Sequence, residues 1–234
     1  MPIKGVKAGQ PRSDNETVIW DIYPGKTALL VVDMQECFCN PGGSLYSPQT
    51  AKIVPNINRL AAFCRRVGTP VVWIREQVGL YPGDWKHYYD FLPGAKAKDF
   101  DLRVGNPGSK LFKKLDSKAV DWEVVKNRFS PFAPNNPSHP NLDRLLSSNE
   151  IDTVIVTGTD TNVCCDNTAR DAMNLDYKVI MVSDACCSYD NALHEATLET
   201  LKSWYAMVCT TDELIETIQT QTADKTRVQP PATR

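Results

Sequence analysis

The stretch TALLVVD, residues 27–33, decides the fold of this chain. It is a short, apolar run rich in β-branched residues. Such a run is typical of a strand buried on both faces, because strands with one wet face alternate apolar and polar residues. The stretch TVIVT at residues 153–157 repeats the pattern. Further strands are predicted at residues 71–74, 124–125, 179–182 and 207–209.

Between these strands, apolar residues recur at helical spacing and predict helices. The predicted helices cover residues 53–67, 142–146, 162–175, 191–204 and 212–219. Strands that alternate with helices form parallel βαβ units with right-handed crossovers. We therefore predict an α/β fold, a three-layer α/β/α sandwich with a doubly wound, mainly parallel six-stranded sheet. In such folds ligands bind outside the carboxyl ends of the strands.

The chain length of 234 residues favours one domain, which we place at residues 27–221 after an N-terminal extension, residues 1–26. Residues 79–122 hold no convincing strand and are rich in aromatic residues, so we expect a lid or an interface insertion there. Residues 222–234 are polar and contain proline, and we expect a mobile C-terminal tail.

The composition excludes several classes of protein. Hydrophobic residues make up 42% and charged residues 23% of the chain, and the formal net charge is -2, so nucleic-acid binding has no electrostatic support. The longest apolar runs span about five residues, whereas a membrane-spanning helix needs about 20. The first ten residues lack the apolar core of a secretory signal, and we expect the eight cysteines to be reduced in a cytoplasmic protein.

Three chemically capable side chains follow three of the predicted strands: Asp33, Lys126 and Cys164. Parallel topology brings them to one edge of the sheet. A thiol at a helix N-terminus feels free backbone N–H groups and the helix dipole, and an adjacent ammonium stabilises the thiolate further. A carboxylate can take the thiol proton and return it to a leaving amine, while backbone N–H groups form an oxyanion hole. The set predicts a covalent acyl-transfer site.

The residues alone leave ordinary structural roles open. An aspartate at a strand end often caps a loop, a lysine after a short strand is usually a solvated charge, and a cysteine beside valine is usually in the core. A glycine-rich phosphate loop and a dinucleotide fingerprint are both missing from the sequence. The three histidines share no metal-type spacing, and His194 is expected to be structural, although a Cys–His dyad stays open.

The sequence resembles the isochorismatase-like cysteine hydrolases over roughly residues 25–215. The matching stretches are VVDMQ at 31–35, PGGSL at 41–45, KNRFSPF at 126–132, TGTDTNVCCDNTARDA at 157–172, SDA at 183–185 and HEATLETL at 194–201. The resemblance implies a catalytic triad of Asp33, Lys126 and Cys164, with Cys165 not the nucleophile. It also implies a cis peptide bond between Thr159 and Asp160, and an oxyanion hole formed by the backbone N–H groups of Asp160 and Cys164.

Departures from known subfamilies narrow the expected substrate. True isochorismatases lack the nucleophilic cysteine, so amide hydrolysis is favoured over vinyl-ether hydrolysis. Nicotinamidases carry a metal-binding Asp-x-His where this chain has Arg75-Glu-Gln77, so we expect no metal and no cofactor. The pattern is most similar to hydrolases of ureides and carbamoyl compounds. A biuret- or triuret-type substrate is favoured, and ureidoacrylate- or N-carbamoylsarcosine-type amidohydrolases, a vinyl-ether hydrolase and a non-catalytic binding protein are the alternatives.

The remaining expectations concern the pocket and the assembly. The candidate substrate-binding residues are Phe38, Asn127, Arg128 and Tyr189. Phe38 is equally well explained as a core residue, and Asn127 and Arg128 as supports for Lys126. The partners that we expect are a small-molecule substrate and further copies of the chain in a homo-oligomer, a tetramer or a dimer, with no nucleic acid and no membrane.

Overall fold

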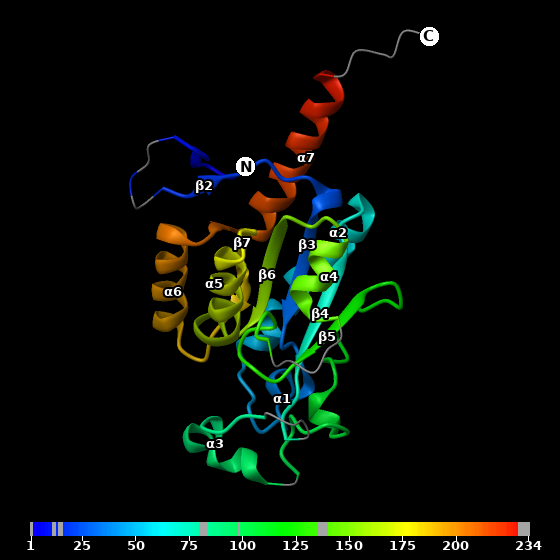
Figure 1. Cartoon of the computed structure of the whole chain (residues 1–234), viewed down its shortest axis with the longest axis vertical. Helices are drawn as coiled ribbons and strands as arrows, with labels where there is room; N and C mark the ends of the chain where they lie inside the picture. The colour runs from blue at the N-terminus through cyan, green and yellow to red at the C-terminus, as the bar shows by residue number, and fades with distance from the viewer. Residues whose placement is uncertain are drawn as a thin grey trace.

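The computed structural model describes residues 2–10, 13, 16–79, 84–97, 99–134 and 140–228. Its main sheet has six strands, all parallel, in the order β5-β4-β3-β6-β7-β8 (Figure 1). The strands are β3 (Thr27–Val32), β4 (Val71–Glu76), β5 (Trp122–Lys126), β6 (Thr153–Thr159), β7 (Lys178–Cys187) and β8 (Met207–Cys209). The predicted α/β class and the six strands are confirmed, and the sheet is wholly rather than mainly parallel.

The chain winds the sheet outward twice from its centre. From β3 it adds β4 and β5 on one side, then crosses back to β6 and adds β7 and β8 on the other. The switch point therefore lies between β3 and β6, whose residues are all buried. A crevice outside the carboxyl ends of strands at such a switch point is where these folds bind ligands.

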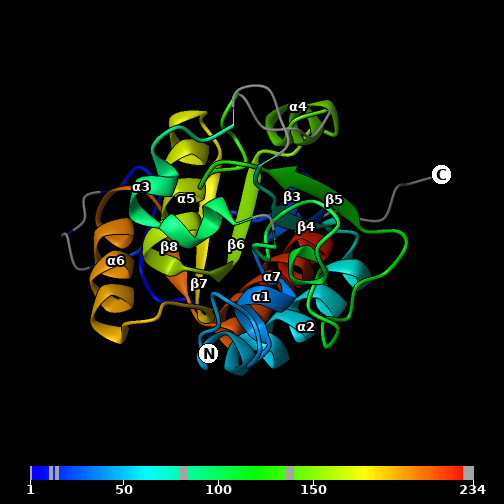
Figure 2. The same cartoon turned by 90° about the horizontal axis from the view of Figure 1, so that it is seen from below.

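Helices cover both faces of the sheet, because alternate strand residues point to opposite sides. On one face, Leu29 and Val31 pack in a core cluster with residues of α2 (Thr50–Val67) and α7 (Thr211–Val228). On the other face, Ala28, Leu30 and Val32 belong to a cluster with residues of the remaining long helices. These are α4 (Leu142–Ser148), α5 (Asp166–Asn174) and α6 (Asn191–Trp204). Figure 2 shows the resulting three layers from below.

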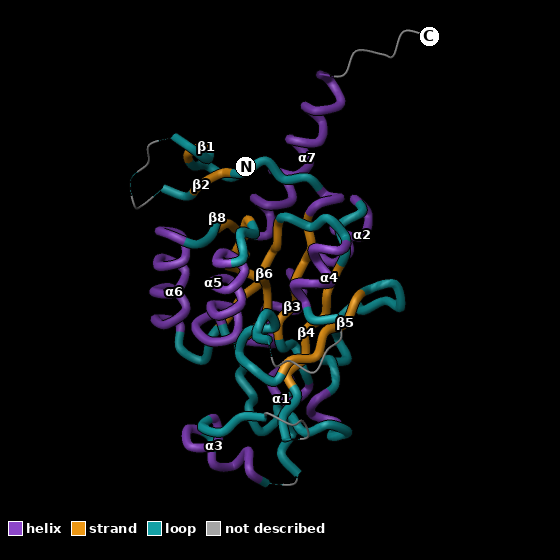
Figure 3. The backbone as a smooth tube through the Cα atoms, viewed as in Figure 1, coloured by secondary structure: helices purple, strands orange, loops and turns teal. Residues whose placement is uncertain are grey.

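The described part of residues 79–122 is mainly loop, with one short helix, α3 (Tyr88–Phe91), and two 3-10 turns, Pro93–Lys96 and Pro107–Ser109. The part around α3 lies beyond the carboxyl ends of the strands, and the chain then returns to enter β5 at its amino end (Figure 3). Tyr81 and Lys98 lie outside the described residues. The segment is tied to the domain at two isolated bridges, Gln35 with Leu111 and Val78 with Arg103.

Two features outside the main sheet were not predicted from the sequence. The N-terminal extension contains a two-stranded parallel sheet of β1 (Val6–Lys7) and β2 (Val18–Ile19). The last helix, α7, continues to Val228 instead of ending at Gln219, so residues 222–228 are helical, while 229–234 lie outside the described residues. Polar residues at the end of a helix carry little periodic signal, which is why the sequence placed this end too early. No described helix is long and apolar enough to cross a membrane.

Candidate active site

Asp33 directly follows β3 and is fully buried. Its backbone N–H donates to the carbonyl of Ile74 on the neighbouring strand, at 2.9 Å. Its φ of 53° lies in the left-handed region, which aspartate tolerates better than most residues. The turn takes the chain out of the sheet at the switch point, and the carboxylate stays inside the protein.

Lys126 is the last residue of β5, and its side chain is also fully buried. The Nζ atom lies 2.8 Å from Asp33 Oδ2, on a strand two positions away in the sheet. It donates to Cys164 Sγ at 3.5 Å and to Glu76 Oε2 at 3.3 Å. A buried ammonium needs several acceptors, and these three atoms supply them.

Glu76 is a fourth member of this cluster, and the sequence analysis did not single it out. It is the last residue of β4, is 2% exposed and pairs in register with Lys126. The buried Gln35 side chain holds its backbone, accepting from the Glu76 N–H at 2.8 Å and donating to its carbonyl at 3.0 Å. The available signal was a charged residue after an apolar run, but the predicted strand ended at Ile74, two residues before Glu76.

Cys164 lies in a π-helical turn, Thr161–Cys165, that joins β6 to α5. The peptide bond between Thr159 and Asp160 is cis, at the position where the resemblance placed it. Gly158 allows β3 and β6 to approach here, since a Cβ at this position would lie 2.1 Å from the carbonyl oxygen of Val32. A buried 2.8 Å hydrogen bond joins Thr161 Oγ1 to His194 Nδ1. His194 therefore contacts the first residue of the turn that carries Cys164.

Burial is the largest influence on the pKa values of the four groups in the cluster. Burial raises the pKa of the Cys164 thiol well above its usual value, Asp33 adds to the rise, and Lys126 opposes it without reversing it. Burial likewise raises the pKa of Asp33 against the effect of Lys126, and raises the pKa of Glu76 to about 7. Burial lowers the pKa of Lys126, but Asp33, Cys164 and Glu76 outweigh burial and raise that pKa well above its usual value. Within the cluster, burial therefore opposes ionisation of the Cys164 thiol, and Lys126 favours it.

Asp33, Glu76 and Cys164 offer ligand atoms that lie within 4.8 Å of one another, a grouping that could hold a metal ion. The Lys126 ammonium approaches all three of these groups at 2.8–3.5 Å. A metal ion bound at the roughly 2.0–2.3 Å typical of such ligands would collide with that ammonium. The cluster therefore fits a charged lysine and does not fit a metal.

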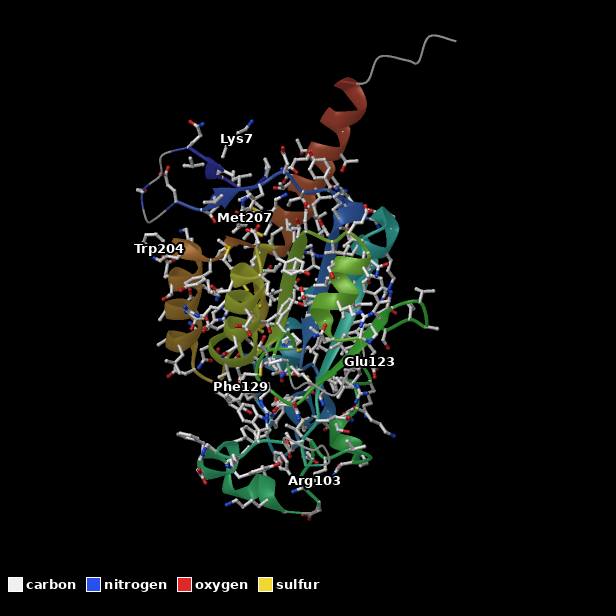
Figure 4. The ribbon with its side chains drawn as sticks, in the orientation of Figure 1. Lys7, Arg103, Glu123, Phe129, Trp204 and Met207 are labelled. Carbon is white, nitrogen blue, oxygen red and sulfur yellow. The ribbon has the colours of Figure 1, made fainter. Side chains whose placement is uncertain are left out.

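Aromatic side chains cover the cluster from the side of α3. Tyr88 stacks on Trp85 with ring centroids 5.1 Å apart, and Trp85 contacts Phe129 at 5.0 Å. Burial raises the pKa of Tyr88, and the charges of Glu76 and Cys164 raise it further. Figure 4 shows Phe129 between the sheet and the segment that carries α3.

The four predicted substrate-binding residues differ in their surroundings. Phe38 and its neighbour Cys37, both in α1 (Glu36–Cys39), belong to the same buried core cluster. Burial raises the pKa of Cys37, and the charges of Asp101, Asp33 and Glu76 raise it further. Asn127 is fully buried, and the guanidinium of Arg128 lies over the Trp85 ring at 4.7 Å. Tyr189 is 52% exposed, and its hydroxyl donates to the carbonyl of Leu45.

Comparison with known proteins agrees with this architecture. The isochorismatase domain profile matches residues 27–213. The ureidoacrylate amidohydrolase RutB of Acinetobacter baylyi is 26% identical over 222 residues, covering 85% of this chain and 86% of the relative. A cysteine hydrolase structure from Pseudomonas syringae pv. phaseolicola superposes with a TM-score of 0.81 at 32% identity, covering 91% of this chain and 99% of that chain. The N-carbamoylsarcosine amidase structure from Thermoplasma acidophilum superposes with a TM-score of 0.66 at 30% identity, covering 80% of this chain and 98% of that chain.

The doubly wound sandwich and the long profile match define the class of this protein as a hydrolase on an α/β fold. The chain belongs to the isochorismatase family.

Proposed function

We propose that this protein is a cysteine-dependent amidohydrolase that releases ammonia from the terminal C(=O)–NH2 group of a small ureide or carbamoyl compound. The contact of the Lys126 ammonium with both Asp33 and Cys164 is the observation that carries the proposal. The names of two relatives, a ureidoacrylate amidohydrolase and an N-carbamoylsarcosine amidase, support this substrate class. Biuret or triuret is the substrate that we favour.

In the first step, the Cys164 sulfur bonds to the carbonyl carbon and the C–N bond breaks. The thiol proton passes to Asp33 and from there to the departing nitrogen, which leaves as ammonia. Burial of the thiol means that the proton leaves only as the sulfur attacks, with Lys126 holding the developing charges. The backbone N–H groups of Asp160 and Cys164 bind the oxyanion. Water then adds to the acyl-sulfur intermediate, releases the acid and returns one proton to sulfur through Asp33.

Ammonia release from biuret, triuret, ureidoacrylate, N-carbamoylsarcosine and nicotinamide tests this proposal. Wild type is expected to turn over at least one ureide, and Cys164→Ser is expected to lose at least 1,000-fold in kcat, about the size of losing a nucleophile. Cys165→Ser is the matched control, because it removes a buried thiol from the same turn and is expected to keep activity. Folded wild type that is silent on every ureide, or Cys164→Ser with full activity, contradicts the proposal.

We also infer that the active form is a cytoplasmic homo-oligomer, a tetramer or a dimer. The expectation comes from the family resemblance, and light scattering on the purified full chain measures the mass directly. A monomer at the concentration of the activity assay would contradict it.

A further inference from the structure

We infer that Glu76 recognises the nitrogen that the substrate keeps after cleavage, and so selects ureides over plain amides. This inference rests on the proposed function and assigns a substrate-reading role to a residue outside the Asp33, Lys126 and Cys164 set. The carboxylate would accept a hydrogen bond from the retained N–H of a –NH–C(=O)–NH2 group. A plain amide has carbon at that position and cannot make this bond.

The first argument is the place of Glu76 in the cluster. Its Oε2 lies 4.0 Å from Cys164 Sγ and 3.3 Å from Lys126 Nζ. An attacked carbonyl carbon must come within about 3–3.5 Å of the sulfur. A nitrogen bonded to that carbon is then within reach of the Glu76 carboxylate.

The second argument is an unused acceptor. The Oε1 atom of Glu76 is buried and has no hydrogen-bond partner among the described residues. A buried carboxylate oxygen without a donor is costly, and such a group in a native protein needs an explanation. A donor from the substrate supplies that missing partner.

The third argument is the division of work between two carboxyls. Asp33 has the shorter contact with Lys126 and is the group that takes the thiol proton in the proposed mechanism. Glu76 has no proton to carry in that mechanism, yet Gln35 fixes its backbone through two hydrogen bonds. A carboxylate whose backbone is fixed in this way, and whose Oε2 lies 4.0 Å from the nucleophile, fits a binding role. The groups that face it are Lys126, Asp33, Asp84, Cys164 and Tyr88.

A pair of substrates that differ by one group tests the inference. Biuret and malonamide have the same heavy-atom connectivity, but malonamide has CH2 where biuret has the central NH. For each enzyme the ratio of kcat/KM for biuret to that for malonamide is measured. If another ureide is the better substrate, that ureide and its CH2 analogue replace the pair. A loss of folded enzyme scales both values equally and leaves the ratio unchanged.

Glu76→Gln is expected to lower this ratio by about 10- to 100-fold, the range for a hydrogen bond to a charged group. Glu123→Gln is the control, because it removes an exposed carboxylate from β5 at the edge of the sheet and should leave the ratio unchanged (Figure 4). If Glu76→Gln yields no folded protein, Glu76→Asp, which retracts the carboxylate by one methylene, is measured in the same way.

The outcomes separate the two proposals. If the Glu76 variant turns over ureides with an unchanged ratio, the inferred role of Glu76 is wrong and the proposed function still stands. Glu76 then contacts the leaving group or only supports Lys126. Absence of ureide turnover in wild type overturns the proposed function itself.

Discussion

Replacing Lys126 with methionine is expected to destabilise the protein strongly at pH 8 and far less at pH 5. Methionine matches most of the volume of the buried stem but removes the ammonium. Asp33 and Glu76, at 2.8 and 3.3 Å from Nζ, then remain buried without their counter-charge. Breaking a buried ion pair from one side costs about 3–5 kcal/mol. That is a large share of the roughly 5–15 kcal/mol that keeps a domain folded.

The pH dependence follows from the two carboxyls. Burial raises the pKa of Glu76 from 4.5 to about 7 even with Lys126 present, and raises that of Asp33 as well. Lys126 opposes both shifts, so its loss raises both pKa values further. A carboxyl whose pKa is higher in the folded state binds more protons there, so stability falls as the pH rises from about 4.5 through the folded pKa. At pH 5 the Glu76 carboxyl of the variant is protonated, and the raised pKa of Asp33 favours its neutral form, so the loss should be smaller than at pH 8.

Urea denaturation at pH 5 and pH 8, followed by circular dichroism, measures the two losses. Lys178→Met is the control, because Lys178 is a partly exposed lysine whose pair with Asp152 is 3.4 Å long and worth less than about 1 kcal/mol. A Lys126→Met loss below about 1 kcal/mol at pH 8, or an equal loss at both pH values, would refute the picture of a buried ammonium neutralising two carboxyls.

Three further predictions concern the same end of the sheet. Asp33→Asn should speed alkylation of Cys164 by iodoacetamide while ammonia release is lost, because Asp33 raises and Lys126 lowers the pKa of that thiol. Mass spectrometry locates the label, and slower labelling than in wild type would contradict this prediction. Gly158→Ala should lower the free energy of unfolding, measured by urea denaturation, by more than about 2 kcal/mol, because the φ of residue 158 is 114° and the new Cβ would lie 2.1 Å from the Val32 carbonyl oxygen. A urea midpoint equal to that of wild type would show that β3 and β6 can separate there. The ratio of kcat/KM for biuret to that for malonamide should rise as the pH increases through about 7, where Glu76 ionises, and should not change with pH in Glu76→Gln. A wild-type ratio that does not change with pH argues against an ionised acceptor.

Local sequence carried much of the fold. Buried parallel strands have an unmistakable apolar pattern, so β3 and β6 were predicted within two residues of their ends. Helix α6 was predicted at its exact bounds, since its apolar residues recur along one face. The hydrophobic pattern did not predict the polar end of α7. It also did not predict the two-residue strands β1 and β2, whose pairing depends on contacts distant in sequence.

The candidate site divides in the same way. Asp33, Lys126 and Cys164 could be picked out from the sequence, because each follows a strand and the family resemblance covers all three. Glu76 could not, because its importance comes from its register with Lys126 across two strands and from the clamp of Gln35, which only the folded chain brings together. The pKa of the thiol also depends on tertiary structure. The sequence indicates that an ammonium is near Cys164, but only the folded chain buries the thiol, and burial raises its pKa against the effect of Lys126.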